Sequence, residues 1–350
     1  MADLARTNLA LAHGIAQSTV PLIALTKEFN VKGLLLALAT VIGLPSLAAA
    51  AELLVLNKSD ATLSFVDPDS GKTIGSVPTG EGPHEIELSS NGRLAFVTNY
   101  GASVAGKTLS VIDVPARKEQ QRVDLGNLRR PHGLAFTQGA LYFTAEDSRS
   151  IGRYDPSTKQ VDWTFKTDQE RTHMVVASRD GSKLFASNMG SNSISAIERS
   201  AKDQWKQTLI RVGEGPEALD LSPDGRELWT AHSGDGRVSL IDPTKNEVIA
   251  TLDAKTKRSN RLKFTPNGQL VLISDLGAGE LVIFDARART EKARLPLGKS
   301  PTGVLIPTND LAYVAVSGDN KIAVIDLKTL RVLKTIRTGN NPDGMAWVRD

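Results

Sequence analysis

The chain has 350 residues, of which 40% are hydrophobic and 23% charged, and its formal net charge is +3 at pH 7. This composition is typical of a globular protein, and so small a net charge gives no general attraction to nucleic acid. The absence of cysteine excludes disulfides, thiolate metal sites, covalently attached c-type haem and a lipid-modified N-terminal cysteine.

The first element along the chain is an apolar run. Residues 34–44 (LLLALATVIGL) follow Lys32 and precede a small-residue stretch at 48–51, a pattern typical of a secretory signal peptide. We predict a signal peptide over residues 1–51, cleaved before Glu52. The region ahead of Val31 is unusually long for a signal peptide, and a translation start at Val31 would give one of ordinary length. A retained membrane anchor is the alternative, although a span needs roughly 20 apolar residues. The pattern therefore predicts a periplasmic or secreted protein with no transmembrane span in the mature chain.

Beyond the leader, the chain reads as short strands joined by turns, and three strand types each occur seven times at a period of about 43 residues. The inner type, as in PHEIEL, begins at residues 83, 131, 172, 216, 259, 301 and 342. The second type, as in LAFVTN, begins at residues 53, 94, 141, 184, 228, 270 and 312. A third type ends in a carboxylate in six repeats, as in VSLID. A fourth strand type follows it in the repeat. Four strands per repeat at this period predict a β-propeller, whose blades stack because one sheet cannot bury both of its faces alone.

Neither end of the repeat region makes a complete blade. The first strand after the leader is of the second type, and the last one, at residues 342–348, is of the inner type. We therefore predict an all-β fold over residues 52–350: a single seven-bladed propeller of four-stranded antiparallel blades. The N- and C-terminal strands should share one blade, with residues 345–348 pairing with 53–56, because such closure removes unpaired sheet edges.

The segment FVTNYG at residues 96–101 resembles the signature of the YVTN-type (YncE-like) β-propeller repeat family. The turns SPDG at 222–225 and TPNG at 265–268 and strand ends such as LID at 240–242 are similar to that family as well. The resemblance covers about residues 53–350 and implies a seven-bladed propeller outside the cytoplasm. Related propellers include lactone hydrolases, lyases and non-catalytic binders, so it implies either a lactonase-like enzyme or a binding module. The second repeat, with the shorter turn TQG at 137–139, and the fourth, without the strand-end Asp, depart from the pattern.

Two further motifs are interpreted as structural. The strand-end aspartates are expected to accept hydrogen bonds from backbone N–H groups of the following turns. The stretch GASVAGKT at residues 101–108 fits a phosphate-binding loop letter for letter, but such a loop needs a helix directly after it. Residues 109–114 predict a strand instead, so we expect no nucleotide cofactor.

The histidines indicate the candidate site. His84, His132 and His173 each occupy the second residue of an inner strand in three consecutive repeats, so the ring should bring them together at one mouth of the axial channel. The remaining repeats place at this position Glu217, Asn260, Thr302 and Asp343. The turn after the second strand lies on the same face and contributes Asn57, Asn99, Glu146, Asn188, His232, Asp275 and Ser317. Arginines expected to border the opening are Arg130, Arg171 and Arg258.

We interpret this mouth as a polar site for a small molecule or a divalent metal ion. His84, His132 and His173 are the candidate metal ligands and, together with Glu146, the candidate catalytic residues, since imidazole serves both as a ligand and as an acid–base group. One hypothesis is lactonase-like hydrolysis, in which a bound ion or an imidazole activates water. The alternative is a non-catalytic binding or protein-interaction platform. We expect a monomer with a small-molecule or protein partner, without c-type haem and without a nucleic-acid partner.

Overall fold

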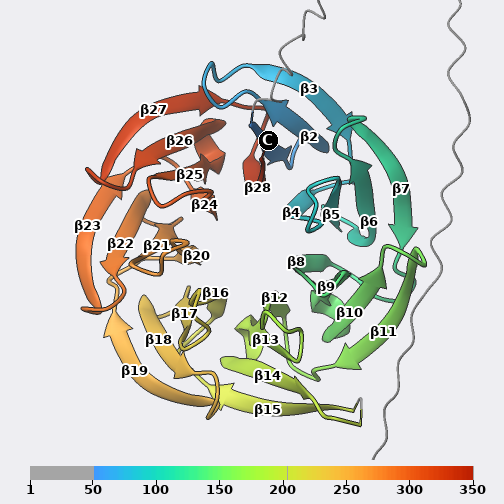
Figure 1. Ribbon diagram of the computed structural model, residues 1–350. Coiled ribbons are helices and arrows are strands. Elements are labelled where there is room, and N and C mark those ends of the chain that lie inside the picture. The colour runs from blue at the N-terminus through green and yellow to red at the C-terminus, as the bar shows by residue number, and fades with distance from the viewer. Residues whose placement is uncertain (1–50, 203, 350) are drawn as a thin grey trace, which may run out of the picture. The chain divides into compact units, whose positions relative to one another are not determined.

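The computed structural model describes residues 51–202 and 204–349, which form 28 strands and three short 3-10 helices. The strands make seven four-stranded antiparallel sheets arranged as blades around a central axis (Figure 1). The all-β, seven-bladed propeller is thereby confirmed. The predicted signal peptide falls on residues that lie outside the described part of the chain, apart from Ala51.

Each blade uses its four strands in order from the axis outwards. The innermost strands are β4 (Pro83–Leu88), β8 (Pro131–Thr137), β12 (Thr172–Ala177), β16 (Pro216–Leu221), β20 (Ser259–Phe264), β24 (Pro301–Leu305) and β28 (Pro342–Val348). The second strands are β1 (Glu52–Asn57), β5 (Leu94–Gly101), β9 (Ala140–Ala145), β13 (Lys183–Asn188), β17 (Leu228–His232), β21 (Leu270–Asp275) and β25 (Leu311–Val316).

The third strands are β2 (Thr62–Val66), β6 (Ala105–Asp113), β10 (Ser150–Asp155), β14 (Ser193–Arg199), β18 (Arg237–Asp242), β22 (Glu280–Asp285) and β26 (Lys321–Asp326). The outermost strands are β3 (Thr73–Pro78), β7 (Lys118–Asp124), β11 (Gln160–Lys166), β15 (Trp205–Arg211), β19 (Glu247–Asp253), β23 (Thr290–Pro296) and β27 (Arg331–Arg337). The 3-10 helices η1 (Glu146–Ser148), η2 (Met189–Ser191) and η3 (Ser317–Asp319) follow three of the second strands.

The hydrophobic core lies between neighbouring blades. In one cluster, Trp229 and Leu240 of one blade pack with Phe264 and Ile273 of the next, and all four side chains are buried. The second and third strands are apolar on both faces because a neighbouring blade covers each face. The outermost strands are largely exposed, as in β27, where only Ile336 is buried. Packing between blades therefore holds the ring together and leaves the innermost strands to line the axis.

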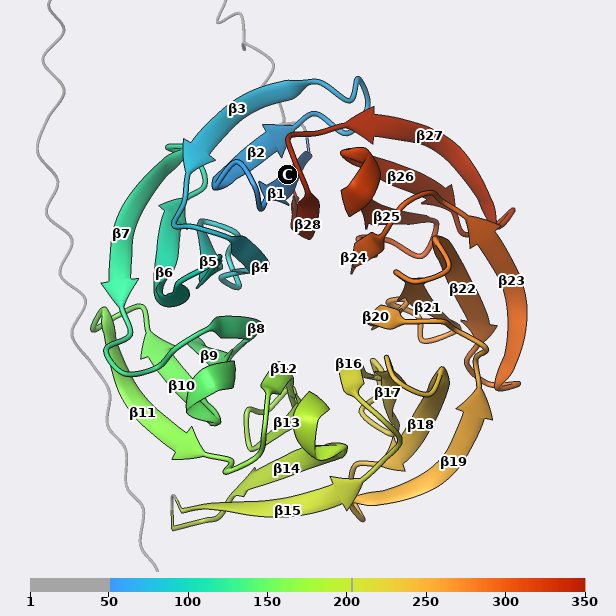
Figure 2. The same ribbon diagram turned by 180° about the vertical axis from the view of Figure 1, so that it is seen from behind.

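Ring closure occurs as predicted, with β28 and β1 in one sheet. Leu53 pairs with Trp347, Leu54 with Ala346 and Val55 with Met345. Figures 1 and 2 show the C-terminal strand β28 at the axis, next to the blue N-terminal strands. The last strand of the chain is therefore the innermost strand of the first blade.

The structural interpretation of the two other motifs also holds. Strand β6 begins at Ala105 and runs through the GKT stretch, so strand, and no helix, follows the phosphate-loop match. Lys107 Nζ forms an ion pair with Asp124 at 2.9 Å. The strand-end Asp242 accepts backbone hydrogen bonds from Thr244 and Lys245. Among the residues that the structure describes, no helix is long and apolar enough to span a membrane.

Candidate functional site

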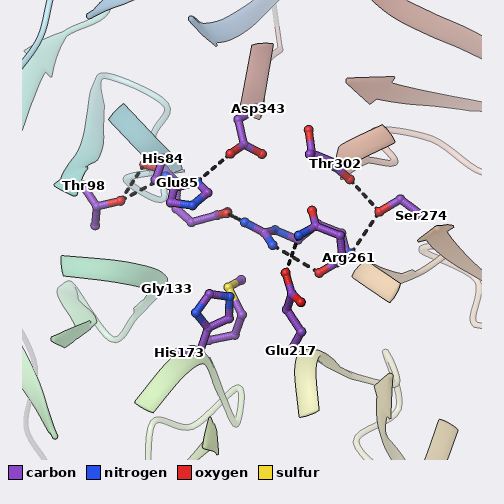
Figure 3. Close-up of polar contacts among 12 residues, drawn as sticks. His84, Glu85, Thr98, Gly133, His173, Glu217, Arg261, Ser274, Thr302 and Asp343 are labelled. Carbon is purple, nitrogen blue, oxygen red and sulfur yellow. Dashed lines mark hydrogen bonds and ion pairs between the residues drawn. The ribbon is translucent and has the colours of Figure 1, made fainter. Parts of the chain in front are cut away.

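A β-bulge near the start of each innermost strand shapes the axial channel. In the blade of β4, the register against β5 shifts between Pro83 and Ile86, and the Glu85 amide donates to Thr98 Oγ1 at 3.0 Å. An extra residue of this kind interrupts the simple alternation of side chains. Consecutive residues therefore reach the axis, as His84 and Glu85 do in Figure 3.

Hydroxyl groups of the second strands hold the channel residues of the next blade in place. Thr144 Oγ1 donates to the carbonyl of His173, Ser187 Oγ to that of Glu217 at 3.2 Å, and Ser274 Oγ to that of Thr302 at 2.7 Å. The inner strands also approach closely at Gly133, where a Cβ atom would lie 2.6 Å from Met174 Cα. The backbone that carries the channel side chains is thus fixed from blade to blade.

The structure brings the three predicted histidines together. The ring centroids of His84 and His132 lie 4.1 Å apart, and those of His132 and His173 lie 3.7 Å apart. His132 is 1% exposed and His173 6%, so only His84 retains appreciable contact with solvent. Equivalent positions in three consecutive blades therefore form one compact group at the axis.

Two of these imidazoles are each held by a buried carboxylate. His173 Nδ1 contacts Glu146 Oε1, and the other oxygen of Glu146 accepts a hydrogen bond of 2.6 Å from the Tyr100 hydroxyl. His84 Nδ1 lies 2.6 Å from Asp343 Oδ2. Because a carboxylate accepts hydrogen bonds, each pair favours the tautomer with the imidazole proton on Nδ1 and the lone pair on Nε2. We call these three histidines with Glu146 and Asp343 the axial cluster.

The charges around the axial cluster keep its carboxyl groups ionised. Burial works to raise the pKa of Glu146, but the contacts with His173 and Tyr100 outweigh it and lower this pKa to about 2. Burial likewise opposes ionisation of Asp343, and His84, Lys58 and Arg261 together hold its pKa below the ordinary value. Burial, followed by the neighbouring imidazoles, lowers the pKa of His132 well below its usual range. The cluster therefore combines anionic carboxylates with neutral His132 at ambient pH.

His132 differs from its two neighbours in having no hydrogen-bond partner. Both of its ring nitrogens are buried, and neither has a partner in the described part of the chain; Nε2 of His173 is also buried and unpaired. A buried polar atom without a partner is costly in a folded protein. These nitrogens are therefore the best candidates for binding a ligand.

Two overlapping groups could hold a metal ion: His84, Glu85 and His132, and His132, Glu146 and His173. In each group the candidate donor atoms lie within 4.8 Å of one another. His132 belongs to both groups. The site accordingly centres on this residue.

An ion pair lies next to the axial cluster across the channel. Arg261 on β20 contacts Glu85 on β4 (Figure 3). Asn260 on β20 contacts Glu217 on β16. Arg261 is 3% exposed, and although burial opposes its charge, Glu85, Asp343 and Glu217 raise its pKa above the ordinary value. Arg261 and Asn260 thus add two polar contacts to the interior of the channel beside the axial cluster.

The predicted mouth residues divide into two sets. Glu217, Asn260, Thr302 and Asp343 are buried on the innermost strands, as the repeat position predicts. Arg130 and Arg171 lie at the entries of β8 and β12, and the Arg130 guanidinium is 4.8 Å from the centre of the Tyr100 ring. These residues and the three histidines occupy the region where the sequence places them.

The turn residues after the second strands mostly form hydrogen bonds within their own blades and the adjacent turns. Asn99 bonds to Gly80, Thr108 and Ser110, and Asn188 bonds to Thr172, Ser193 and Ser195. Asp275 accepts four backbone amides of the adjacent turns, and His232 contacts Asp235 at 3.0 Å. Asn57 likewise bonds to Thr62 and Ser64. Glu146, the first residue of η1, alone of the six named here contacts the axial histidines.

Four residues near the site lie outside the sequence prediction: Lys58, Glu85, Tyr100 and Arg261. Glu85 and Arg261 reach the axis only because of the bulges, which strand alternation does not reveal. Tyr100 is the last but one residue of β5, and it contacts Glu146 from the neighbouring blade. The one sequence signal is the ionisable residue at this repeat position in two repeats, where the other five have Gly, Ala or Met.

A second charged group lies two residues further along the inner strands. Lys263 Nζ is 3.6 Å from Asp220 Oδ1, and Glu87 and Lys263 line a cavity of about 440 Å³. Burial raises the pKa of Glu87 to about 7, although the Lys263 ammonium opposes this. A carboxyl whose folded pKa exceeds the unfolded value favours folding at low pH, and this contribution is lost as the pH rises towards 7.

A Glu87→Gln variant should therefore gain stability relative to the wild type as the pH rises from 5 to 8. We expect the difference in melting temperature, variant minus wild type, to increase by about 2 °C over this range. Thermal unfolding of both proteins at the two pH values measures it. A difference independent of pH would show that Glu87 titrates normally.

The geometry defines a seven-bladed β-propeller with a buried histidine–carboxylate group on its axis, and comparisons with known proteins agree with the propeller fold. Residues 166–310 match the model of the cytochrome D1 heme domain. The chain is 26% identical over 180 residues to the protein YncE of Salmonella typhimurium, covering 50% of this chain and 51% of YncE. It is 26% identical over 184 residues to antigen Lp49 of Leptospira interrogans, covering 46% and 40% of the two chains.

A solved structure from Bacteroides fragilis, whose description proposes a 6-phosphogluconolactonase, superposes with a TM-score of 0.71 at 16% identity. The superposition covers 87% of this chain and 99% of that one, and it shows the fold alone. The chain spans about half the length of the curated relatives it matches. Together, the ring and these matches fit a YncE-like β-propeller family.

The haem of the matched domain type does not fit inside this channel. The matched residues include His173 and His232. His173 contacts Glu146, and its ring centroid lies 3.7 Å from that of His132. His232 is buried against Asp235. Arg261 crosses the axis beside the cluster to reach Glu85 (Figure 3). Within each of the two candidate groups the donor atoms lie within 4.8 Å of one another, which leaves no slot between them for a macrocycle.

Proposed function

We propose that the axial cluster binds a divalent transition-metal ion through His84, His132 and His173. The observation that carries this proposal is His132, which is 1% exposed and has two buried ring nitrogens without a partner among the described residues. Imidazole donors favour zinc, copper or nickel over calcium or magnesium, which prefer oxygen. The residues present therefore suit a transition-metal ion of this kind.

Asp343 and Glu146 act on this site by orienting its ligands. Each contacts the Nδ1 side of one histidine, which directs the Nε2 atoms of His84 and His173 towards the site. Glu146 is bonded at both oxygens and stays ionised, with a pKa of about 2. In this proposal Glu146 is a positioning residue rather than a metal ligand.

The rim of the mouth favours an anionic ligand. Arg130 and Arg171 directly precede the inner strands β8 and β12, and the entry position has a positive φ angle in four other blades as well, at Gly82, Gly215, Ser300 and Asn341. The guanidinium groups of these two arginines are suited to a carboxylate or a phosphate.

Hydrolysis of a small anionic lactone or ester is the enzymatic form of this proposal. A bound divalent ion would supply water activation. Arg130 and Arg171 would hold the anionic group, and the carboxylate–histidine pairs would keep the ligand atoms fixed. The fold shared with the Bacteroides fragilis protein supports this form by analogy only.

The alternative is a binding protein without turnover. It is favoured by the state of Glu146, because a carboxylate bonded at both oxygens with a pKa of about 2 is a poor general base at neutral pH. We place either function outside the cytoplasm, in the periplasm or at the cell surface, because residues 1–51 have the pattern of a signal peptide.

Metal titration of the purified protein tests the proposal. We expect calorimetry with Zn²⁺ to give one tight site per chain, and a variant with His84, His132 and His173 all changed to Ala to bind none. Circular dichroism confirms that the variant is folded. A wild-type protein that binds no Zn²⁺, Ni²⁺ or Cu²⁺ above the level of the variant would contradict the proposal. Turnover of a panel of anionic lactones by the Zn²⁺-loaded protein then separates enzyme from binder.

A further inference from the structure

Lys58 lies directly against the axial cluster and has no counterpart in the other blades. It follows β1, and its backbone amide donates to the carbonyl of Asn341 at 3.0 Å, which fixes it beside β28. The corresponding positions after the other second strands carry no lysine or arginine; two of them are Tyr100 and Asp147. Its side chain is 34% exposed, so the ammonium lies at the boundary between the cluster and solvent.

The Lys58 ammonium contacts two groups of the cluster at once. Its Nζ atom lies 3.4 Å from His84 Nε2 and 3.3 Å from Asp343 Oδ2. An ammonium group only donates hydrogen bonds, so the Nε2 atom of His84 must accept with its lone pair. The proton of His84 is then on Nδ1, facing Asp343, in agreement with the 2.6 Å contact there. Both neighbours therefore select the same tautomer.

This lone pair is also the one that a metal ion would need. We propose that Lys58 is a tethered cation that occupies the metal's place at His84 Nε2, so that ion binding requires its displacement and Lys58 sets the affinity of the site. The inference rests on the proposed metal-binding function. His84, His132 and His173 promote metal binding in that proposal, and Lys58 is a fourth residue, which opposes it.

The reach of the Lys58 charge supports a role across the whole cluster. Burial is the largest cause of the lowered pKa values of His84 and His132. The Lys58 ammonium is among the charges that lower both values further. A divalent cation brought to the same place would be repelled by that charge. Once displaced, the ammonium can stay paired with Asp343, since the two already form an ion pair. Displacement therefore exchanges one cation for another without leaving the buried carboxylate unpaired.

The test compares Zn²⁺ binding by the wild type and by Lys58→Met at low ionic strength. We expect the variant to bind at least tenfold more tightly, because it lacks both the competing donor and the repelling charge. Lys58→Gln is a second variant that keeps a hydrogen-bond donor without the charge, and it serves if the Met variant folds poorly. Lys328→Met is the matched control, since Lys328 also pairs with a carboxylate, Asp310 at 2.9 Å, but is exposed and outside the cluster.

A second readout needs no metal. In nitrogen NMR spectra of the metal-free proteins, the His84 Nε2 resonance should shift when Lys58 is replaced and stay unchanged in Lys328→Met. Tighter binding by either Lys58 variant, or binding by these variants alone, supports the proposal. Equal affinities of wild type and variants overturn it while leaving the metal site in place. No binding by any of the proteins overturns the metal site and the role of Lys58 together.

Discussion

A His132→Ala variant is expected to bind Zn²⁺ about a hundredfold more weakly than the wild-type protein. His132 lies between His84 and His173, belongs to both candidate ligand groups and has two buried nitrogens without a partner in the described chain. Loss of a ligand from a preformed site costs more than the 10- to 100-fold typical of an orienting group. Isothermal titration of each variant measures the change.

Coupling between the histidines distinguishes one shared site from three separate structural roles. His84→Ala and His173→Ala should each lose most of the affinity, and the double variant should lose little more, because residues that act as a unit are non-additive. His232→Ala is the control, since His232 is buried against Asp235 in its own blade. If the three single variants keep the wild-type affinity and fold normally, the histidines are part of the scaffold.

Removal of residues 343–350 is expected to unfold the whole ring. This deletion takes away nearly all of β28 and leaves β1 with an unpaired edge. It also opens two packed clusters, because Ala346 packs with Leu54 and Ile86, whereas Met345 packs with Val55 and Tyr313. The loss should exceed about 5 kcal/mol, which is comparable with the total stability of an ordinary domain.

Thermal unfolding of the truncated protein measures this effect. A second truncation that removes residues 349–350 is the control, because it ends after β28 (Pro342–Val348) and keeps the full pairing with β1. The shorter truncation should melt within a few degrees of the wild type. A longer truncation that also melted there would show that the ring does not depend on its closing strand.

The repeat made the ring predictable and left the details of the site open. Period, strand type and the incomplete ends determine blade number and closure, because every blade obeys the same packing rule. The convergence of His84, His132 and His173 follows from symmetry in the same way. Glu85 and Arg261 could not be found by strand alternation, since a bulge places them at the axis. Asn99 and Asn188 share a turn position with Glu146, and only the local turn geometry decides which of them faces a histidine.

The carboxylate that holds His84 has a consequence for synthesis. His84 belongs to the second blade, whereas Asp343 lies on the last strand, 259 positions later in the chain. A ribosome therefore makes the first histidine of the site 259 positions before its orienting partner. Until residue 343 has been made and β28 has docked, no intermediate can hold His84 against this carboxylate. In the proposed metal-binding function, the site with His84 oriented is therefore available only after β28 has docked.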